Sequence, residues 1–377
     1  MKKNILIFKF PFQSCYGGGE RHLISLVNEL QQINFNFYLV TSCNVLVEQF
    51  NKRNWPVKKI WSAPEPVAKW SIILFPLLGL PMFLILVYFL FYYRLAKNVK
   101  GVYCISLTEK ILITLPARML GLKVFWSEHV GFQRWLTLNP LRIFYRFYSR
   151  YAKIIVVSQA LKEQLIKLGV NASNIHIIYN GFDFSYYQSL LKKPKTQTKN
   201  QFVIGSIGRL EKEKGVDCLF MAVKKALTIV PKLNLIIVGE GSERKRLEWL
   251  SKNLQIDRLT QFVGFQKEPA AWIRNFDIFV LPSVGRESFG NVLVEALALE
   301  RPAIASRIEG TPEIIKTDQT GILVQPGNSD ELAQAIIYLY QNPDTAKQLG
   351  LNGRAFVEQN FPKERMVASY FQLFQNI

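Results

Sequence analysis

Two carboxylates eight residues apart could bind two points of one extended ligand. Glu287 stands in a polar loop after an apolar run, and Glu295 lies about two turns inside the helix predicted near Phe289. The loop glycine, Gly290, lets backbone N–H groups come close to a ligand, and the free N–H groups of a first helical turn favour an anion such as phosphate. Residues 279–303 therefore predict a binding site for a long polyol phosphate.

Positive charge for such a ligand is available in a second turn of the chain. Arg209 follows the apolar run 202–207 after one glycine, and Lys214 comes just before a helical pattern. At the carboxyl end of a strand, an arginine and a lysine can neutralise a diphosphate. The alternative is that the charged side chains of this turn are solvated surface charges. This alternative suits Lys212, in the middle of the turn, better than Arg209 near the strand.

The first half of the chain has a glycine-rich turn and a histidine at comparable positions. Gly18 and Gly19 lie between an apolar run and a helical pattern, and His129 closely follows another apolar run. In open α/β sheets, ligands bind beyond the carboxyl ends of the strands. The spacing GxGxxG is not met, because His22 stands where the third glycine would be, and this disfavours a dinucleotide site. A plain turn and a structural histidine are the alternatives.

The elements that must position these residues are two series of alternating strands and helices, which is typical of parallel α/β sheets. Strands are predicted at 5–10, 35–41, 101–106, 124–127, 153–158 and 175–179, and then at 202–207, 233–238, 261–263, 278–281 and 303–306. A polar, charged segment without apolar spacing separates the two series. We therefore expect an α/β protein of two Rossmann-like domains, at 1–185 and 202–360, joined by a linker at 186–201. A helix at 361–377 can pack back on the first domain.

Residues 70–93 form a run of 24 residues without a charge. As one helix it would be about 36 Å long, enough to cross a bilayer, but Pro76, Gly79 and Pro81 interrupt its first half. A single crossing would also place strands of one predicted sheet on opposite sides of the membrane. We therefore expect this segment to dip into one leaflet or to lie in the interface. A true span and a buried helix pair are the alternatives.

Composition excludes several classes of protein. The four cysteines contain no CxxC pair and there are only three histidines, so neither a disulfide framework nor a zinc site is indicated. Of the net charge of +19, residues 1–185 carry most, with 22 Lys and Arg against 8 Asp and Glu, which suits an anionic surface. The basic aromatic stretch 134–150 has helical spacing and suits lipid headgroups, so no nucleic-acid partner is expected.

Together, these motifs resemble the retaining glycosyltransferases of family 4, whose GT-B fold has two Rossmann-like domains facing across a cleft. The resemblance rests on GRL at 208–210, KG at 214–215, VGEG at 238–241, FVG at 262–264, ESFGNVLVE at 287–295 and GTPEI at 310–314 in the second half. In the first half it rests on GGGE at 17–20, SEH at 127–129, VS at 157–158 and NGFD at 180–183. Arg286 departs from the family pattern, which more often has a small or acidic residue there.

The resemblance implies a retaining hexosyl transfer from a nucleotide-sugar, with no metal and no cofactor besides this donor. The implied catalytic residues are Glu287, His129, Arg209 and Lys214. The implied donor-binding residues are Gly18, Gly19, Arg209, Lys214, Phe262, Val263, Glu287, Ser288, Phe289, Gly290, Asn291 and Glu295. In this scheme Arg209 and Lys214 bind the diphosphate, Glu295 binds the ribose hydroxyls, and Glu287 binds the donor sugar.

The apolar run 70–93 is more extreme than the membrane-facing helix usual in the family, and it indicates a lipophilic acceptor, a lipid-linked saccharide or glycolipid. We therefore expect a peripheral or monotopic protein on the cytoplasmic side of the cell membrane, working in polysaccharide or lipopolysaccharide synthesis. A membrane-anchored sugar-nucleotide-binding protein without catalysis and a nucleotide-sugar epimerase of related fold are the alternatives.

Overall fold

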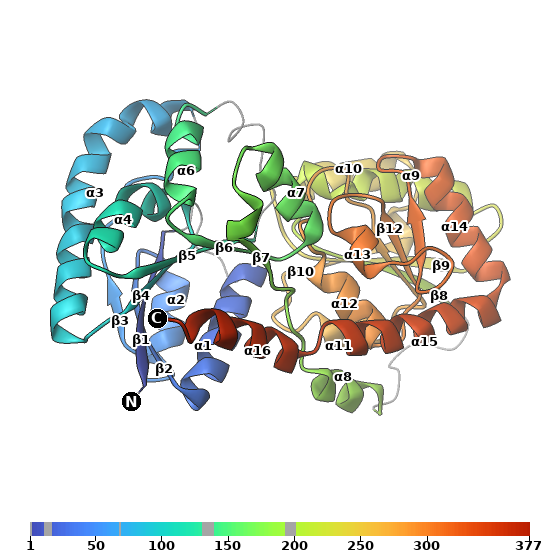
Figure 1. The fold of residues 1–377 in the computed structure, drawn as a ribbon. Helices are drawn as coiled ribbons and strands as arrows, with labels where there is room; N and C mark the ends of the chain where they lie inside the picture. The colour runs from blue at the N-terminus through green and yellow to red at the C-terminus, as the bar shows by residue number, and fades with distance from the viewer. Residues whose placement is uncertain (1, 11–16, 68, 130–138, 193–200) are drawn as a thin grey trace. The chain divides into compact units, whose positions relative to one another are not determined.

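The computed structural model describes residues 2–10, 17–67, 69–129, 139–192 and 201–377. The chain divides into two compact units, each built around one parallel sheet (Figure 1). The first unit comprises Met1–Asn180 together with Glu364–Ile377, and the second comprises Gly181–Lys363. The last residues of the chain therefore belong to the first unit.

The sheet of the first unit has seven parallel strands, and it confirms the six strands expected from the sequence. In spatial order they are β3 (Val57–Lys59), β2 (Phe35–Thr41), β1 (Lys3–Lys9), β4 (Gly101–Cys104), β5 (Lys123–Glu128), β6 (Lys153–Val156) and β7 (Ile175–Ile177). β3 is the strand that the sequence did not indicate. Since all pairs are parallel, the carboxyl ends of the strands meet at one edge, where residues such as Lys9 and Glu128 lie.

Helices cover both faces of this sheet. They are α1 (Gly18–Ile33), α2 (Asn44–Asn51), α3 (Lys69–Ala96), α4 (Leu107–Met119), α6 (Arg142–Ser149), α7 (Gln159–Lys167) and α16 (Lys363–Phe374). Neighbouring residues of a strand point to opposite faces, and β5 shows this directly. Phe125 packs on Phe374 of α16, with ring centroids 4.7 Å apart, whereas Trp126 packs on Tyr145 of α6 at 5.0 Å.

The apolar run forms one curved helix, α3, with Pro76 and Pro81 in its first half (Figure 1). This contradicts the alternative of a buried helix pair. One row of side chains is buried at helical spacing, and α3 packs on α4, which in turn packs on α6. That row is Ser71, Phe75, Gly79, Met82, Leu86, Leu90 and Tyr93. The opposite face is apolar and exposed, with Leu77 71% accessible. By length and composition α3 is able to cross a membrane.

The sheet of the second unit has six parallel strands. In spatial order they are β10 (Thr260–Gly264), β9 (Leu233–Val238), β8 (Phe202–Ile207), β11 (Ile278–Leu281), β12 (Ala303–Ser306) and β13 (Ile322–Val324). All but β13 were expected from the sequence. The helices are α8 (Phe184–Leu191), α9 (Val216–Ala226), α10 (Arg244–Asn253), α11 (Ala270–Ile273), α12 (Asn291–Ala298), α13 (Thr311–Ile314), α14 (Ser329–Gln341) and α15 (Pro343–Asn360).

The segment expected to be a linker, 186–201, contains part of a helix. α8 covers its beginning and belongs to the second unit, because Tyr187 and Leu190 are buried and Arg274 donates to the main-chain oxygen of Leu190 at 3.4 Å. Residues 193–200 lie outside the described residues. The expected C-terminal helix is α16, which lies within the first unit for nearly all its length.

Candidate active site

Three glycines bring the carboxyl ends of β8, β9 and β10 together in the second unit. Gly208 N donates to Val238 O at 3.0 Å, and Gly239 N donates to Gly264 O at 2.9 Å. Gly239 has φ +142°, and a Cβ added there would lie 1.8 Å from Gly208 O, so no other residue fits. This close packing holds Arg209, which follows Gly208, at the edge where parallel sheets bind ligands.

The segment predicted to line a base pocket, Phe262 and Val263, lies in β10 at this edge. The Phe262 ring packs on Phe220, with centroids 6.0 Å apart, and the guanidinium carbon of Arg244 lies 4.6 Å from its centre. The register between β10 and β9 shifts between Phe262 and Gly264, so Val263 has no partner in the ladder. That the two residues line a base pocket stays a prediction.

Lys214 and Glu287, which the sequence placed in separate motifs, form an ion pair. Lys214 Nζ lies 2.7 Å from Glu287 Oε2, and the side chains are only 17% and 13% exposed. Ser283 Oγ donates to the same carboxylate oxygen at 3.1 Å. Lys214 ends a short 3₁₀ helix (Lys212–Lys214) that stops at Gly215 in a left-handed conformation, so its side chain is aimed at the loop after β11.

Glu213 connects two arginines and was not expected from the sequence. Its Oε1 lies 3.5 Å from Arg209 and its Oε2 lies 2.9 Å from Arg286. Arg286, the departure from the family pattern, is therefore a neighbour of the expected cations. Arg209 remains 64% exposed and is free to turn toward a ligand. A narrow pocket lies here between the turn and the loop, lined by Gly208, Arg209, Lys214 and Pro282.

The loop between β11 and α12 is held by the loop that follows β12. Glu287 N donates to Glu309 Oε2 at 2.8 Å, and Gly310 N donates to Glu287 O at 3.1 Å. Phe289 is buried, with its ring centroid 5.2 Å from that of Phe361. The loop that carries Glu287 and Ser288 is thus fixed before any ligand arrives. Sequence reasoning missed Glu309, although the motif GTPEI begins immediately after it.

The helix α12 starts later than predicted. Gly290 has φ +88°, a left-handed conformation that no helical residue adopts, so the first helical residue is Asn291. Glu295 consequently lies about one turn inside the helix instead of two. Its side chain is buried, whereas Asn291 is half-buried at the helix N-terminus. The N–H groups of this terminus lie on the same loop as Glu287, as an anion site requires.

In the first unit, the predicted glycines Gly18 and Gly19 begin α1. Glu20 caps this helix, because its Oε2 accepts from Gly17 N at 3.1 Å, while its Oε1 pairs with Lys9 at 2.6 Å. A Cβ on Gly19 would lie 3.8 Å from Lys9 Nζ, an ordinary contact, so Gly19 lies beside this lysine. Lys9, the last residue of β1, is buried and was not expected from the sequence.

His129 directly follows β5, at the same edge of the sheet as Lys9. Its Nε2 lies 2.8 Å from Ser127 Oγ, and its ring lies 4.6 Å from that of His22 in an edge-on arrangement. Loss of solvent, together with the nearby charges of His22, Lys9 and Lys110, lowers the pKa of His129 well below its usual 6.5. Burial and Lys9 lower the pKa of His22 to about 4. Both imidazoles are therefore neutral at pH 7.

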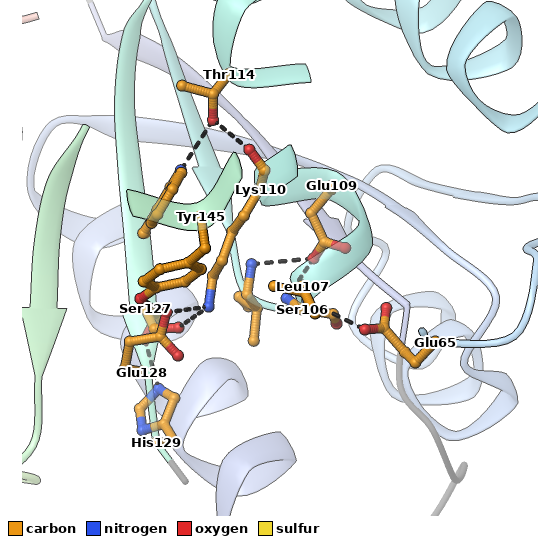
Figure 2. A network of polar contacts seen from close by, with 12 residues as sticks. Glu65, Ser106, Leu107, Glu109, Lys110, Thr114, Ser127, Glu128, His129 and Tyr145 are labelled. Carbon is orange, nitrogen blue, oxygen red and sulfur yellow. Dashed lines mark hydrogen bonds and ion pairs between the residues drawn. The ribbon is translucent and has the colours of Figure 1, made fainter. Parts of the chain in front are cut away.

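A buried ion pair lies directly behind His129 (Figure 2). Lys110 Nζ of α4 contacts Glu128 Oε1 at 2.6 Å and donates to Ser127 O at 2.7 Å. Tyr145 donates from its hydroxyl to the same oxygen of Glu128 at 2.8 Å. Sequence reasoning missed this pair, and the available signal was a lysine inside the apolar pattern of 107–119. The pair fixes the end of β5 and hence the place of His129.

Two further carboxyl groups are buried at the start of α4 (Figure 2). Glu65 Oε2 accepts from Leu107 N at 3.2 Å, and Glu109 Oε1 accepts from Ile105 N at 3.1 Å. Within the described residues, Glu65 Oε1 and Glu109 Oε2 accept no hydrogen bond. Burial, with the second carboxyl nearby, raises the pKa of Glu65 to about 8, and burial raises that of Glu109 to about 7. A proton is therefore bound at this pair at neutral pH.

The chemistry available to each unit follows from these contacts. The second unit presents cations, a helix N-terminus and two carboxylates, which suits a phosphorylated polyol. The first unit presents a neutral imidazole and a second helix N-terminus. In the part of the chain that the structure describes, no three potential ligand side chains are grouped as a metal would need. A metal-free reaction stays a prediction.

Comparison with known proteins agrees with the two-unit division. A sequence profile described as "Glycosyltransferase Family 4" matches residues 16–186, and one described as "Glycosyl transferases group 1" matches residues 188–356. The chain is 30% identical over 231 residues to N-acetyl-alpha-D-glucosaminyl L-malate synthase of Bacillus anthracis, covering 59% of each protein. It is 27% identical over 225 residues to the capsular polysaccharide biosynthesis glycosyltransferase CapM of Staphylococcus aureus, covering 56% of this chain and 58% of CapM. These matches span less than two thirds of either relative.

Solved structures extend the similarity of fold to the complete chain. The crystal structure of HepE from Anabaena in complex with UDP superposes with a TM-score of 0.84, at 21% identity and full coverage of both chains. At this level of identity, the likeness concerns the fold.

Proposed function

The chain belongs to the glycosyltransferases of group 1 and family 4, and on this premise we propose that it transfers a sugar from a nucleotide-sugar, with retention, to a membrane-associated acceptor. The observation that carries the proposal is the contact of Lys214 with Glu287 beside Arg209 and the N-terminus of α12. These groups would bind diphosphate and sugar at adjacent positions.

In the proposed reaction, the bond between the anomeric carbon and the diphosphate breaks, and a bond from that carbon to the acceptor oxygen forms. The leaving diphosphate takes the proton of the acceptor hydroxyl. Arg209 and Lys214 stabilise the negative charge that develops on the diphosphate, with the N–H groups near Asn291. Lys214 is already held in the site by its ion pair with Glu287, whereas the exposed Arg209 turns toward the diphosphate.

The carboxylates have separate roles in this proposal. Glu295 accepts from the ribose hydroxyls, because a carboxylate accepts both hydroxyls of a vicinal diol. Glu287 orients a hydroxyl of the donor sugar once the diphosphate has replaced it as the partner of Lys214. His129 is neutral, so it offers one donor and one acceptor nitrogen to a sugar hydroxyl and adds no charge.

We further propose that the protein acts as a peripheral or monotopic protein on the cytoplasmic side of the membrane. Support comes from α3, where exposed Leu77, Leu80 and Leu84 follow one another at helical spacing on a basic unit. Since the opposite row of α3 packs on its own unit, a helix lying along the interface agrees with the contacts better than a span. On this placement we propose a lipid-linked saccharide acceptor in polysaccharide synthesis. CapM, one of the relatives, is named for capsular polysaccharide biosynthesis.

The test is a donor and acceptor screen with the full chain. Labelled UDP-sugars and GDP-sugars are incubated with polyprenyl-linked saccharides in membranes. UDP-sugars are included because the HepE structure contains UDP. Soluble hydroxy acids form a second acceptor set, because one relative is named for a malate product. Transfer to a lipid acceptor is expected, and Glu295→Ala should abolish it while leaving the fold intact.

Three outcomes would contradict the proposal in different ways. Tight binding of nucleotide-sugars without transfer to any acceptor would indicate a binding protein. Conversion of one nucleotide-sugar into its epimer would indicate an epimerase. An unaffected rate in Glu295→Ala would remove the assigned donor site.

A further inference from the structure

A basic cavity of about 270 Å³ lies in the first unit, away from every residue discussed above as donor-binding. It opens at the amino edge of β5 and β6, where the strands begin. Its polar lining includes Arg118, Lys123, Arg150, Tyr151, Lys153 and Asn174.

Four cations line this cavity without a counter-charge. Arg118 lies in the last turn of α4, Lys123 begins β5, Arg150 follows α6 and Lys153 begins β6. No carboxylate side chain lines the cavity, and within the described ranges no ion pair joins any of the four to an acidic side chain. Like charges gathered in this way repel one another, so the arrangement is stabilised by a bound anion. Arginine and lysine together suit a phosphate group.

The cavity is separate from the proposed donor-binding and catalytic residues. β5 runs from Lys123 at this edge to Glu128 at the other, and His129 follows Glu128. Five residue steps of a strand span about 17 Å. A ligand here therefore does not touch His129. Ligand pockets usually have volumes of about 300 Å³ or more, so a cavity of about 270 Å³ favours a small group.

We propose that this cavity binds the phosphate of an anionic membrane lipid, a role that rests on the membrane association proposed above. Apolar side chains beside the cations favour a lipid over a soluble phosphate. Met119, next to Arg118, is 81% exposed, and Tyr151 lines the cavity itself while remaining exposed. An apolar side chain with a cation beside it suits the depth at which lipid headgroups lie.

The position of the cavity relative to α3 agrees with a lipid. α3, α4 and α6 each return from the carboxyl edge of the sheet to its amino edge, so their last residues lie near the cavity. Arg94 near the end of α3 donates to Leu120 O, just after α4, at 3.4 Å. Ile143, Phe144 and Phe147 on α6 are exposed as well, and α6 packs on α4 as α3 does. The cavity thus lies at the end of an exposed apolar surface, where headgroups would be.

Vesicle binding tests the proposal with the full chain. Binding is measured by co-sedimentation with phosphatidylcholine vesicles and with vesicles that also contain phosphatidylglycerol. The cavity variant is Arg150→Gln/Lys153→Gln, and the matched control is Lys58→Gln/Lys59→Gln on β3, which removes two charges from the same sheet. We expect the cavity variant to lose at least tenfold more affinity for the anionic vesicles than the control loses, with binding to neutral vesicles unchanged.

Arg118→Gln/Lys123→Gln is a second cavity variant. Both of its side chains are exposed, so a loss of vesicle binding in this variant would not result from a folding defect. Unfolding temperatures are compared for all variants. Equal losses in cavity and control variants would mean diffuse attraction and would overturn the cavity site. Binding of inorganic phosphate is measured by calorimetry. If the cavity variants lose phosphate binding but bind vesicles as well as wild type, the cavity binds a soluble anion instead of a lipid. A wild-type chain that binds no vesicle would overturn both this inference and the membrane association, whereas loss of sugar transfer alone would not affect it.

Discussion

The ion pair of Lys214 and Glu287 makes each of these residues depend on the other. A partly buried lysine without its carboxylate would be costly, and a diphosphate can replace that carboxylate as the partner of Lys214. The charge on Glu287 is then available to a sugar hydroxyl. One contact thereby couples binding of the phosphates to orientation of the sugar.

The first prediction concerns Lys214. Lys214→Ala should lower kcat/KM for transfer about 100-fold or more, because it removes a fixed cation from the developing diphosphate charge. The matched control is Lys212→Ala in the same 3₁₀ helix, where the side chain is exposed, and its rate should stay within about threefold of wild type. Steady-state kinetics with the donor found in the screen measure both. Equal losses in the two variants would contradict the role of Lys214.

The second prediction concerns the protonated pair at Glu65. This carboxyl ionises near pH 4.5 in the unfolded chain but at a pKa of about 8 in the folded chain. The folded chain thus binds a proton that the unfolded chain has lost, so stability falls as pH rises through this window, by up to about 1.4 kcal/mol per pH unit. Glu65→Gln removes the proton dependence and still accepts from Leu107 N.

The unfolding temperature of Glu65→Gln relative to wild type should therefore rise steadily from pH 6 to pH 8. The exposed Glu163→Gln on α7 serves as control, and its difference from wild type should stay level. A difference for Glu65→Gln that is constant with pH would show that this carboxyl is ionised in the fold.

Among single residues, the sequence named those with strong local signals and missed their partners. Lys214 and Glu287 follow directly from motifs, whereas Glu213, Glu309, Lys9 and Lys110 become important only through contacts across the fold. Glu213 and Glu309 stand in polar turns that show no such signal, whereas Lys9 and Lys110 are lysines within apolar patterns whose partners the sequence does not reveal. The roles assigned to the site residues remain predictions that the kinetic variants test.

At the level of elements, hydrophobic runs predicted nearly every strand, and the two exceptions are short. β3 (Val57–Lys59) and β13 (Ile322–Val324) have three residues each and lie at the edges of their sheets. So short a strand gives a weak sequence signal. β7 (Ile175–Ile177) is as short but was expected, because its apolar run continues to Tyr179. The late start of α12 was missed for a comparable reason, because the backbone conformation of Gly290 is not encoded by apolar spacing.

The third prediction separates the two faces of α3. Replacing Leu77, Leu80 and Leu84 by Gln should release the protein from vesicles with little change in unfolding temperature, because these side chains are exposed. By contrast, Leu86→Ala on the buried row should cost about 2–5 kcal/mol of stability without affecting the apolar surface. Deleting the segment would mix the two effects. Vesicle binding that persists in the triple variant at high salt would contradict the role of the exposed face.

At the level of the whole chain, the first unit is completed by residues that come last. Phe374 of α16 is fully buried, and its ring lies 4.7–6.0 Å from those of Phe35, Tyr103 and Phe125. Three strands of the sheet thus pack on one C-terminal side chain. The sequence indicated a C-terminal helix, but its contacts depend on aromatic residues up to 339 positions earlier.

The fourth prediction follows from these contacts. Phe374→Ala should destabilise the first unit by about 3–5 kcal/mol, because a large buried ring is lost and a cavity remains. Hydrogen exchange should then be faster for the amides of β1 and β4 and unchanged for those of β8 and β9. Trp249→Ala, at an exposed position of the second unit, is the control and should alter neither set. Faster exchange throughout both units would contradict separate cores.

The place of α16 also bears on how the protein is made. During translation the segment up to Asn180 leaves the ribosome first, but the side chains that close its core are encoded about 190 residues later. At about 5–20 residues per second this is a delay of roughly 10–40 s. The second unit, which is continuous in the chain, can meanwhile fold. Nascent chains of the first unit therefore emerge with an aromatic surface uncovered on the face of the sheet opposite α3, a state that invites early contact with chaperones.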